Sequence, residues 1–320
     1  IKADGSVVTW GDDTYGGDSS AIADQLSNVQ SISATKNAFA AIKADGSVVT
    51  WGSSTYGGNS SAVSELLTEV QSITASGYGA FAALKADGSV VTWGYALNGG
   101  NSSLVADELI DVKSIYGNGY SFAAMKDDGT IVTWGNSNAG GNSSAVAEQL
   151  TDVQSIFASN TAFAALKSDG TVVTWGYAYG GGDSSEVAHQ LSDVQSITAN
   201  DYSFTAIKTD GSIVTWGANS TGGDSSSVAD QLTDVQFVFS ATRSYAAIKA
   251  DGSVVTWGDE TLGGDSSAVA DQLSNVQSIT AANRAFAAIK ADGSVVTWGD
   301  PTYGGNSSAV SDQLTEVQSI

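Results

Sequence analysis

The chain has 320 residues, with 12 Lys or Arg against 34 Asp or Glu, so its formal net charge at pH 7 is −22. It has no Cys and one His, which excludes disulfide scaffolds, Cys-ligated metal sites, thiol catalysis and multi-histidine metal centres. The acidic balance argues against nucleic-acid binding, and no apolar run is long enough to span a membrane. The composition therefore favours a protein that is not an enzyme and uses neither a metal nor a small-molecule cofactor.

An internal repeat organises the whole chain. Tryptophan recurs at intervals of 41 residues, with one interval of 42. The eight tryptophans are Trp10, Trp51, Trp93, Trp134, Trp175, Trp216, Trp257 and Trp298. We therefore interpret residues 1–320 as a single array of eight units. The pieces before the first and after the last tryptophan are together nine residues shorter than one unit, and the chain does not begin with Met. We accordingly expect a window of a longer array.

One unit illustrates the elements in chain order. The alternating run Val29–Ile32 predicts a strand, and a short variable loop follows it. The β-rich runs Phe39–Lys43 and Ser47–Trp51 flank Asp45–Gly46, which is a strong hairpin signal. After a Gly-Gly step, Asn59–Ser61 is typical of a helix N-cap, and apolar residues four apart in the stretch that follows predict one or two helical turns.

A two-residue turn at Asp45–Gly46 would set the register of this hairpin. It pairs Ala40 with Trp51 and places Phe39 opposite Gly52, where the aromatic ring would cover a strand glycine. Both faces of the hairpin are then largely apolar, whereas a sheet with one solvated face alternates apolar and polar residues. We therefore expect each small sheet to be sandwiched between its neighbours.

The predicted fold is an all-β repeat protein. Sheets of about three antiparallel strands plus a short helical turn, repeated every 41 residues and buried on both faces, indicate a β-propeller of about eight blades. An open spiral or solenoid array is the alternative.

The run from Ala38 to Gly52, followed by Thr55–Gly58, resembles the regulator-of-chromosome-condensation repeat, which combines a strand ending in Ala-Leu, an Asp-Gly turn, Trp-Gly and a Gly-rich step. The short repeat is also similar to that of the beta-lactamase inhibitor protein of the second type, whose Trp-Gly-Asp-Asn-Thr-Tyr-Gly step compares with Trp10–Gly16. The resemblance covers the whole chain and implies blades around a central axis with ligands on loop faces. The family's Gly-x-x-His and its Pro after the Gly-rich step are absent, so no family activity is carried over to residues here.

Variable loops supply the candidate binding residues. The positions two to five residues after each tryptophan differ from unit to unit and contain several tyrosines, which suit protein contact and equally suit packing under the loop. The candidate binding residues are Tyr15, Tyr56, Tyr95, Tyr177, Tyr179 and Tyr303. Another variable loop precedes each Phe-containing strand.

Five sequons are candidate glycosylation sites, at Asn59, Asn101, Asn142, Asn219 and Asn306. Four of them occupy the position eight residues after the tryptophan, where the other units have Asp, and either residue caps a helix.

No residue emerges as a catalytic or metal-binding candidate of comparable strength. His189 stands where the other units have Asp or Glu, so we interpret it as an exposed helix residue. Asp12, Asp13 and Asp18 carry the carboxylates that a calcium site needs, but the other units have no equivalent set of ligands. We therefore do not predict a calcium site.

Three functions remain open. The leading hypothesis is a structural or protein-interaction scaffold that binds a protein partner or itself, as part of a larger extracellular or cell-surface assembly. A discrete inhibitor or adaptor module that uses variable loops on one propeller face is the alternative, and a lectin-like sugar binder is the third. A cytoplasmic location is the alternative to the extracellular one, because the absence of Cys fits both.

Overall fold

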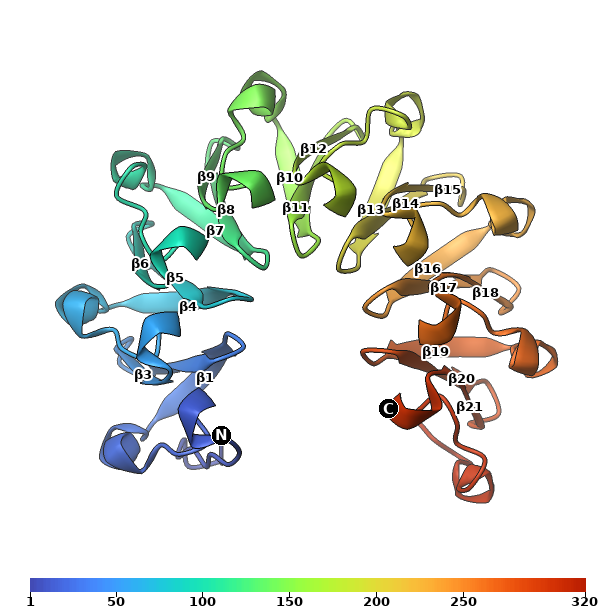
Figure 1. The fold of residues 1–320 in the computed structure, drawn as a ribbon, viewed down its shortest axis with the longest axis horizontal. Coiled ribbons are helices and arrows are strands. Elements are labelled where there is room, and N and C mark those ends of the chain that lie inside the picture. Colours follow the sequence, from blue (N-terminus) through green and yellow to red (C-terminus); the bar gives the residue numbers. More distant parts are fainter. The chain divides into compact units, whose positions relative to one another are not determined.

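The computed structural model describes residues 1–320. Its contacts divide the chain into two compact units, each described here by itself. Unit 1 comprises Ile1–Phe163 with Trp175–Tyr177, and unit 2 comprises Ala164–Thr174 with Ala178–Ile320. In both units, three-stranded sheets and short helices follow one another in chain order (Figure 1).

The strands form seven antiparallel three-stranded sheets, in each of which the middle strand in sequence is also the middle strand in space. The first strands are β1 Val29–Ala34, β4 Val70–Ser76, β7 Val112–Gly117, β10 Val153–Ala158, β13 Val194–Ala199, β16 Val235–Ser240 and β19 Val276–Ala281. The middle strands are β2 Ala38–Lys43, β5 Ala80–Lys85, β8 Ser121–Lys126, β11 Ala162–Lys167, β14 Ser203–Lys208, β17 Ser244–Lys249 and β20 Ala285–Lys290. The third strands are β3 Val48–Gly52, β6 Val90–Gly94, β9 Ile131–Gly135, β12 Val172–Gly176, β15 Ile213–Gly217, β18 Val254–Gly258 and β21 Val295–Gly299.

All the helices are short 3₁₀ helices, and there are two in each repeat. The first follows the third strand, in η1 Asp13–Tyr15, η3 Ser54–Tyr56, η5 Ala96–Asn98, η7 Ser137–Ala139, η9 Ala178–Gly180, η11 Asn219–Thr221, η13 Glu260–Leu262 and η15 Pro301–Tyr303. The second follows the Gly-Gly step, in η2 Ser20–Gln25, η4 Ser61–Leu66, η6 Ala106–Glu108, η8 Ser144–Gln149, η10 Ala188–Gln190, η12 Ser226–Gln231, η14 Ser267–Gln272 and η16 Ser311–Gln313. No helix is long and apolar enough to cross a membrane.

The predicted fold class is confirmed: the chain is an all-β protein of the β-propeller class, built from three-stranded blades with helical turns. The number of blades differs from the prediction, because seven complete sheets are present where about eight were expected. The remainder of the eighth unit contributes Val7–Trp10 and Val317–Ile320, and neither segment is a strand. The terminal unit has no counterparts of residues 280–288, which form the end of the first strand, the loop and most of the middle strand, to which both outer strands of a blade bond.

The turn prediction was wrong by one residue. The Lys43 N–H donates to the Ser47 carbonyl at 2.9 Å, so the hairpin loop has three residues, and Phe39 pairs with Trp51 rather than with Gly52. Gly46 alone has a positive φ, of 76°, whereas a type I′ turn needs two such residues. The Asp45 carboxylate accepts hydrogen bonds from the Ser47 N–H and hydroxyl, at 3.0 and 2.6 Å, and so stabilises this three-residue loop.

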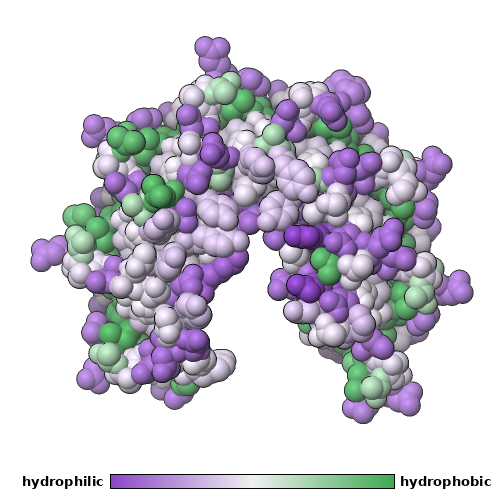
Figure 2. Space-filling view, in the orientation of Figure 1, coloured by the Kyte–Doolittle hydropathy of each residue, from purple (hydrophilic) through white to green (hydrophobic).

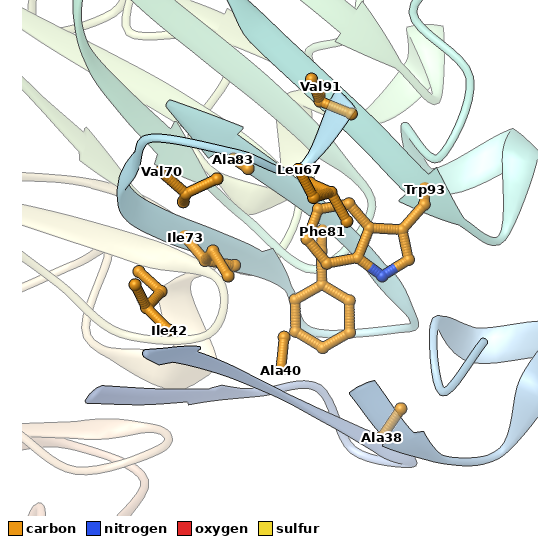
Figure 3. Close-up of a cluster of buried hydrophobic side chains, with 10 residues drawn as sticks. All are labelled: Ala38, Ala40, Ile42, Leu67, Val70, Ile73, Phe81, Ala83, Val91 and Trp93. Carbon is orange, nitrogen blue, oxygen red and sulfur yellow. The ribbon is translucent and has the colours of Figure 1, made fainter. Parts of the chain in front are cut away.

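The core lies between successive blades, as the two apolar faces of the hairpin predicted. One cluster joins Ala40 and Ile42 of β2 to Leu67, Phe81 and residues of the β4–β6 sheet (Figure 3). The middle strand is buried on both faces, and its alanines let the next sheet approach closely.

A tryptophan links each repeat to the one before it. The Trp93 ring stacks on Phe81 of its own sheet with centroids 5.2 Å apart, and its indole N–H donates to the Gly57 carbonyl at 3.0 Å. Gly57 has a φ of 100°, and a Cβ there would lie 2.5 Å from the Phe81 ring, so only glycine fits. The same stack and indole hydrogen bond occur in all seven blades.

Candidate interaction surface at the loop end of the blades

Two variable loops meet at one end of each blade, which we call the loop end. The first loop joins the first and middle strands, and the second contains the 3₁₀ helix after the third strand. They are bonded together, because the Ser53 N–H donates to the Asn37 carbonyl at 2.9 Å and the Tyr95 N–H donates to the Gly79 carbonyl at 2.7 Å. The opposite end carries the Asp-Gly turns, which repeat from blade to blade. Sequence variation is therefore concentrated at the loop end.

The first loops of neighbouring blades bond to each other. In unit 1, the Lys36 N–H donates to the Gly77 carbonyl at 3.1 Å, and the Gly77 N–H donates to the Asn118 carbonyl at 3.0 Å. In unit 2, the Thr242 N–H donates to the Asn283 carbonyl at 3.1 Å. These backbone bonds hold the loops in a defined arrangement before any partner arrives, which lowers the ordering cost of binding.

Aromatic side chains gather at the loop end of unit 1. The Tyr78 and Tyr120 rings stack with centroids 4.5 Å apart, and the Lys36 ammonium lies 3.8 Å from the centroid of Tyr78. Hydrogen bonding from Lys36 is the main cause of a lowered pKa of the Tyr78 phenol. Tyr56 and Tyr95 form a second pair, 5.8 Å apart.

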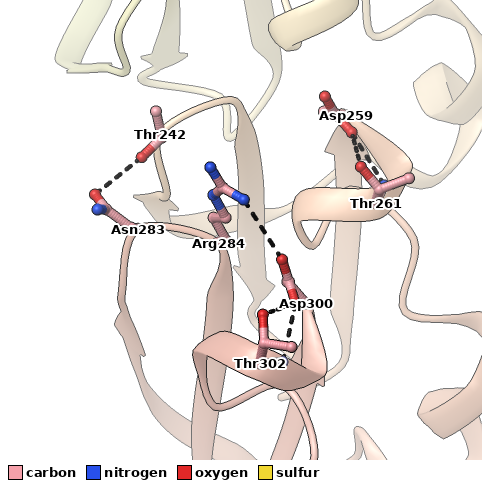
Figure 4. Close-up of polar contacts among 7 residues, drawn as sticks. All are labelled: Thr242, Asp259, Thr261, Asn283, Arg284, Asp300 and Thr302. Carbon is pink, nitrogen blue, oxygen red and sulfur yellow. Dashed lines mark hydrogen bonds and ion pairs between the residues drawn. The ribbon is translucent and has the colours of Figure 1, made fainter.

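Unit 2 places arginines among its tyrosines at the same end. The Arg284 guanidinium lies 4.6 Å from the ring centroid of Tyr303. It also lies 3.7 Å from the Asp300 carboxylate (Figure 4). Arg243 lies 5.9 Å from the ring of Tyr202. Hydrogen bonds from Thr302 to the Asp300 carboxylate lower the pKa of that carboxyl, and Arg284 adds to the effect.

Polar side chains here make a contact between neighbouring blades and further contacts within a single loop. The Thr242 hydroxyl donates to the Asn283 side-chain oxygen at 3.2 Å, and Asp259 accepts from the Thr261 N–H and hydroxyl at 3.0 and 2.7 Å (Figure 4).

The structure places the six predicted tyrosines at this end in two different environments. Tyr15, Tyr177, Tyr179 and Tyr303 are exposed, by 47 to 53%. Tyr56 and Tyr95 are half-buried and pack on each other. The exposed group presents ring surface to solvent, whereas the half-buried pair also supports its own loops.

Sequence reasoning missed the residues of the first loop. These are Lys36, Tyr78, Tyr120, Tyr202, Arg243 and Arg284. A signal was present, because only four cations of the chain do not precede an Asp-Gly turn and three of them lie in this loop.

From β1 onward, the loop end of unit 1 carries little charge. Between Ala34 and Thr161, its two sets of loops contain one charged residue, Lys36, and are rich in Tyr, Ser, Asn and Gly. The acids lie mainly elsewhere. Each Asp of an Asp-Gly turn accepts hydrogen bonds from the Ser or Thr two residues on, which lowers the pKa of these carboxyls. The face shown in Figure 2 is mostly polar or of intermediate hydropathy, with hydrophobic residues in small separate groups.

The four sequon asparagines after the Gly-Gly step all accept a hydrogen bond from the Ser N–H two residues on, at 2.9 to 3.0 Å. The four aspartates at this position make the same bond, at 2.8 to 2.9 Å. Asn and Asp are therefore equivalent in this turn, but the prediction that they cap the helix was wrong: Ser60 is the N-cap residue of η4, and η6 begins only at Ala106. All five sequon asparagines, including Asn219, are exposed.

His189 lies exposed in η10, as the sequence predicted. Asp12 and Asp18 each accept from a backbone N–H two residues on, those of Thr14 and Ser20, both at 2.8 Å. No group of three or more His, Asp or Glu side chains is arranged to hold a metal ion.

Comparison with known proteins identifies structural similarity only. No family model matches the sequence, and no curated protein is similar to it. A structure of Prp20p from Saccharomyces cerevisiae, described with its binding to Gsp1p and histones, is similar at 17% identity over 73% of this chain and 72% of that one, with a TM-score of 0.45. Yeast RCC1 (Prp20) bound to Kap60 is similar at 16% identity over 92% and 75%, with a TM-score of 0.47. The CRINKLY WD40 ectodomain of the Arabidopsis thaliana receptor kinase ACR4 is similar at 17% identity over 82% and 90%, with a TM-score of 0.42. The fold class given above rests on the strand order and blade packing of this chain.

Proposed function

We propose that the protein is a non-enzymatic interaction scaffold that binds a protein partner through the loop end of its blades. The observation that supports it most strongly is the Lys36–Tyr78–Tyr120 stack on loops already bonded to one another. Tyrosine supplies a large contact area at low entropic cost, and Ser, Gly and Asn supply adaptable hydrogen bonds, which is the composition of antibody binding loops. The blades are then a rigid support of the regulator-of-chromosome-condensation type, and the loops determine the partner.

The test is the loss of a purified partner on substitution of the loops. Proteins captured by the immobilised chain are identified, purified and titrated against the wild type, Tyr78→Ser with Tyr120→Ser, and Asp87→Asn at the opposite end. We expect the tyrosine variant to bind at least about tenfold more weakly with its unfolding midpoint unchanged, since tyrosines are frequent hot spots. Equal loss with Asp87→Asn would contradict the proposal.

Two further experiments separate this proposal from the alternatives. Electron microscopy of the purified chain that shows regular assemblies would favour self-association, and saturable binding on a glycan array would favour a lectin. A single high-affinity protein partner lost with one loop cluster would favour the inhibitor or adaptor module.

An extracellular location is part of the same proposal. It is supported by the exposure of the five sequon asparagines. A mass decrease of the native protein on enzymatic deglycosylation would support it, and an unshifted mass together with recovery in the cytosolic fraction would overturn it.

A further inference from the structure

An apolar groove in unit 1 lies beside the η5 and η7 loops of two neighbouring repeats. It lies between the segment from η5 to Val105 and the third strand of the next sheet, β9, and has a volume of about 500 Å³. Leu97, Leu104 and Val105 line it together with Trp134. Leu97 is 68% exposed and Leu104 is 97% exposed. The two leucines therefore present apolar surface to solvent at one place.

The repeat shows that the blade does not require these leucines. At the position of Leu97 the other repeats carry Thr14, Thr55, Asn138, Tyr179, Ser220, Thr261 and Thr302. At the position of Leu104 they carry Ala21, Ala62, Ala145, Glu186, Ser227, Ala268 and Ala309. The other seven repeats form a turn or 3₁₀ helix here without an aliphatic side chain larger than Ala at either position, so both leucines are departures confined to one repeat.

The equivalent groove in unit 2 provides an internal comparison. It has a volume of about 420 Å³ and is lined by Tyr179, Asp183, Glu186 and Trp216. The groove itself is thus a by-product of blade packing, whereas its lining differs. The unit 2 groove contains two carboxylates, and no charged residue lines the groove of Leu97 and Leu104.

Charge complementarity defines the occupant. Asp107 and Glu108 are exposed in η6, two and three residues beyond Val105, and the chain as a whole has a net charge of −22. A second copy of the chain would bring the same net negative charge to the groove. An apolar side chain that enters the groove between flanking cations would gain both burial and attraction.

We propose that this groove is a second docking site, which takes a short segment of a partner protein with large aliphatic side chains flanked by Lys and Arg. It shares the η5 and η7 loops with the loop end, but it does not use the Lys36–Tyr78–Tyr120 stack and does not depend on the proposed function. Apolar burial supplies the affinity, and the exposed acids of η6 together with the net negative charge supply the preference for basic flanks.

The test uses synthetic peptides of defined sequence. The probe is a fluorescein-labelled peptide, Gly-Arg-Lys-Ser-Leu-Ser-Leu-Ser-Arg-Lys-Gly, titrated by anisotropy. One control peptide has both leucines replaced by serine, and another has all four cations replaced by Glu. We expect saturable binding with a Kd below about 1 mM, and at least about tenfold weaker binding of each control. Methyl NMR of the leucine-labelled protein should show shifts at Leu97 and Leu104.

The matched protein variant combines Leu97→Thr with Leu104→Ala, residues that several other repeats carry at these positions. It should keep its unfolding midpoint and lose at least about tenfold in probe affinity, whereas Tyr78→Ser with Tyr120→Ser should leave probe binding unchanged. The proposal is overturned if the leucine variant binds the probe as well as the wild type does. It is also overturned if the serine peptide binds equally, or if the wild type is a dimer that the leucine variant dissociates, because the occupant would then be a second copy.

Discussion

The first tryptophan of the chain and the tryptophans of the blades have the same neighbours in sequence but different environments. Trp10 is 84% exposed, whereas Trp134 is 4% exposed. Trp134 stacks on Phe122 and donates its indole N–H to the Gly99 carbonyl of the preceding repeat, and the corresponding aromatic strand and glycine are not present for Trp10. The comparison shows that a blade is completed by two repeats, because neither supplies the whole tryptophan pocket.

The largest loss of stability is expected when the tryptophan side chain is removed from this pocket. Trp134→Ala removes a buried aromatic side chain and should lower the free energy of unfolding by about 3–5 kcal/mol. Trp10→Ala removes the same group from solvent and should change it by less than about 0.5 kcal/mol. Urea unfolding monitored by circular dichroism measures both variants. Equal losses would show that Trp10 is also packed in solution.

Substitution of glycine tests the same comparison between a complete blade and the terminal unit, with a smaller expected loss of stability. Gly99 and Gly304 both have a φ near +98°, so an alanine at either costs about 1 kcal/mol of backbone strain. At Gly99 the added Cβ would also lie 2.5 Å from the Phe122 ring, whereas at Gly304 no atom lies within 4 Å. Overpacking should add about 1–3 kcal/mol to the Gly99→Ala variant only. Similar losses at both sites, measured by thermal unfolding, would assign the whole effect to strain.

The effect of pH on stability should be smaller than that of either substitution, because it is divided among the Asp-Gly turns. Hydrogen bonds from Ser89 lower the pKa of Asp87 below its ordinary value of 3.8. The unfolded chain therefore binds more protons, so the stabilisation is present at neutral pH and is lost as the pH falls below 3.8.

Asp87→Asn should flatten the acid limb of the unfolding midpoint plotted against pH. Asp4→Asn, the matched change in the terminal unit, should leave the blade transition unaltered. Its turn makes the same bonds to Ser6 but precedes no strand. An acid limb equally flattened by both would indicate that the terminal turn is coupled to the blades.

The smallest effect is expected at the exposed loops of complete blades. Tyr179 is 53% exposed, so Tyr179→Ser should shift the free energy of unfolding by less than about 0.5 kcal/mol, as Trp10→Ala should. Scanning calorimetry of the two variants tests this. A clear loss at Tyr179 would mean that this loop contributes to the blade and not only to the surface.

The repeated features of the fold were predictable because each has a local cause. The Asp-Gly dipeptide predicted the hairpin, and apolar residues on both faces of the two β-rich runs beside it predicted a buried sheet. The register was not predictable to one residue. Asp-Gly fits a two-residue turn and a three-residue loop equally, and the hydrogen bonds from Ser47 to Asp45 favour the second. The Phe39–Trp51 stack follows from that choice.

The candidate surface was only half predictable, for a different reason. The tyrosines after each tryptophan were visible at a fixed offset. Tyr78 and Tyr120 lie in different repeats, and their contact depends on the distance between neighbouring blades, which no single repeat encodes. Comparison of the eight units reveals where a residue departs from the pattern, as at Leu104, but only packing shows what that residue faces.

The indole hydrogen bond to the preceding repeat affects how the number of repeats can change during evolution. Every joint between blades is made by the same donor and acceptor 35 or 36 residues apart. A duplication or deletion of one period, begun at any point of the repeat, therefore recreates joints of a kind that is already present. Lineages can lengthen or shorten the array by recombination within the gene without inventing a new interface.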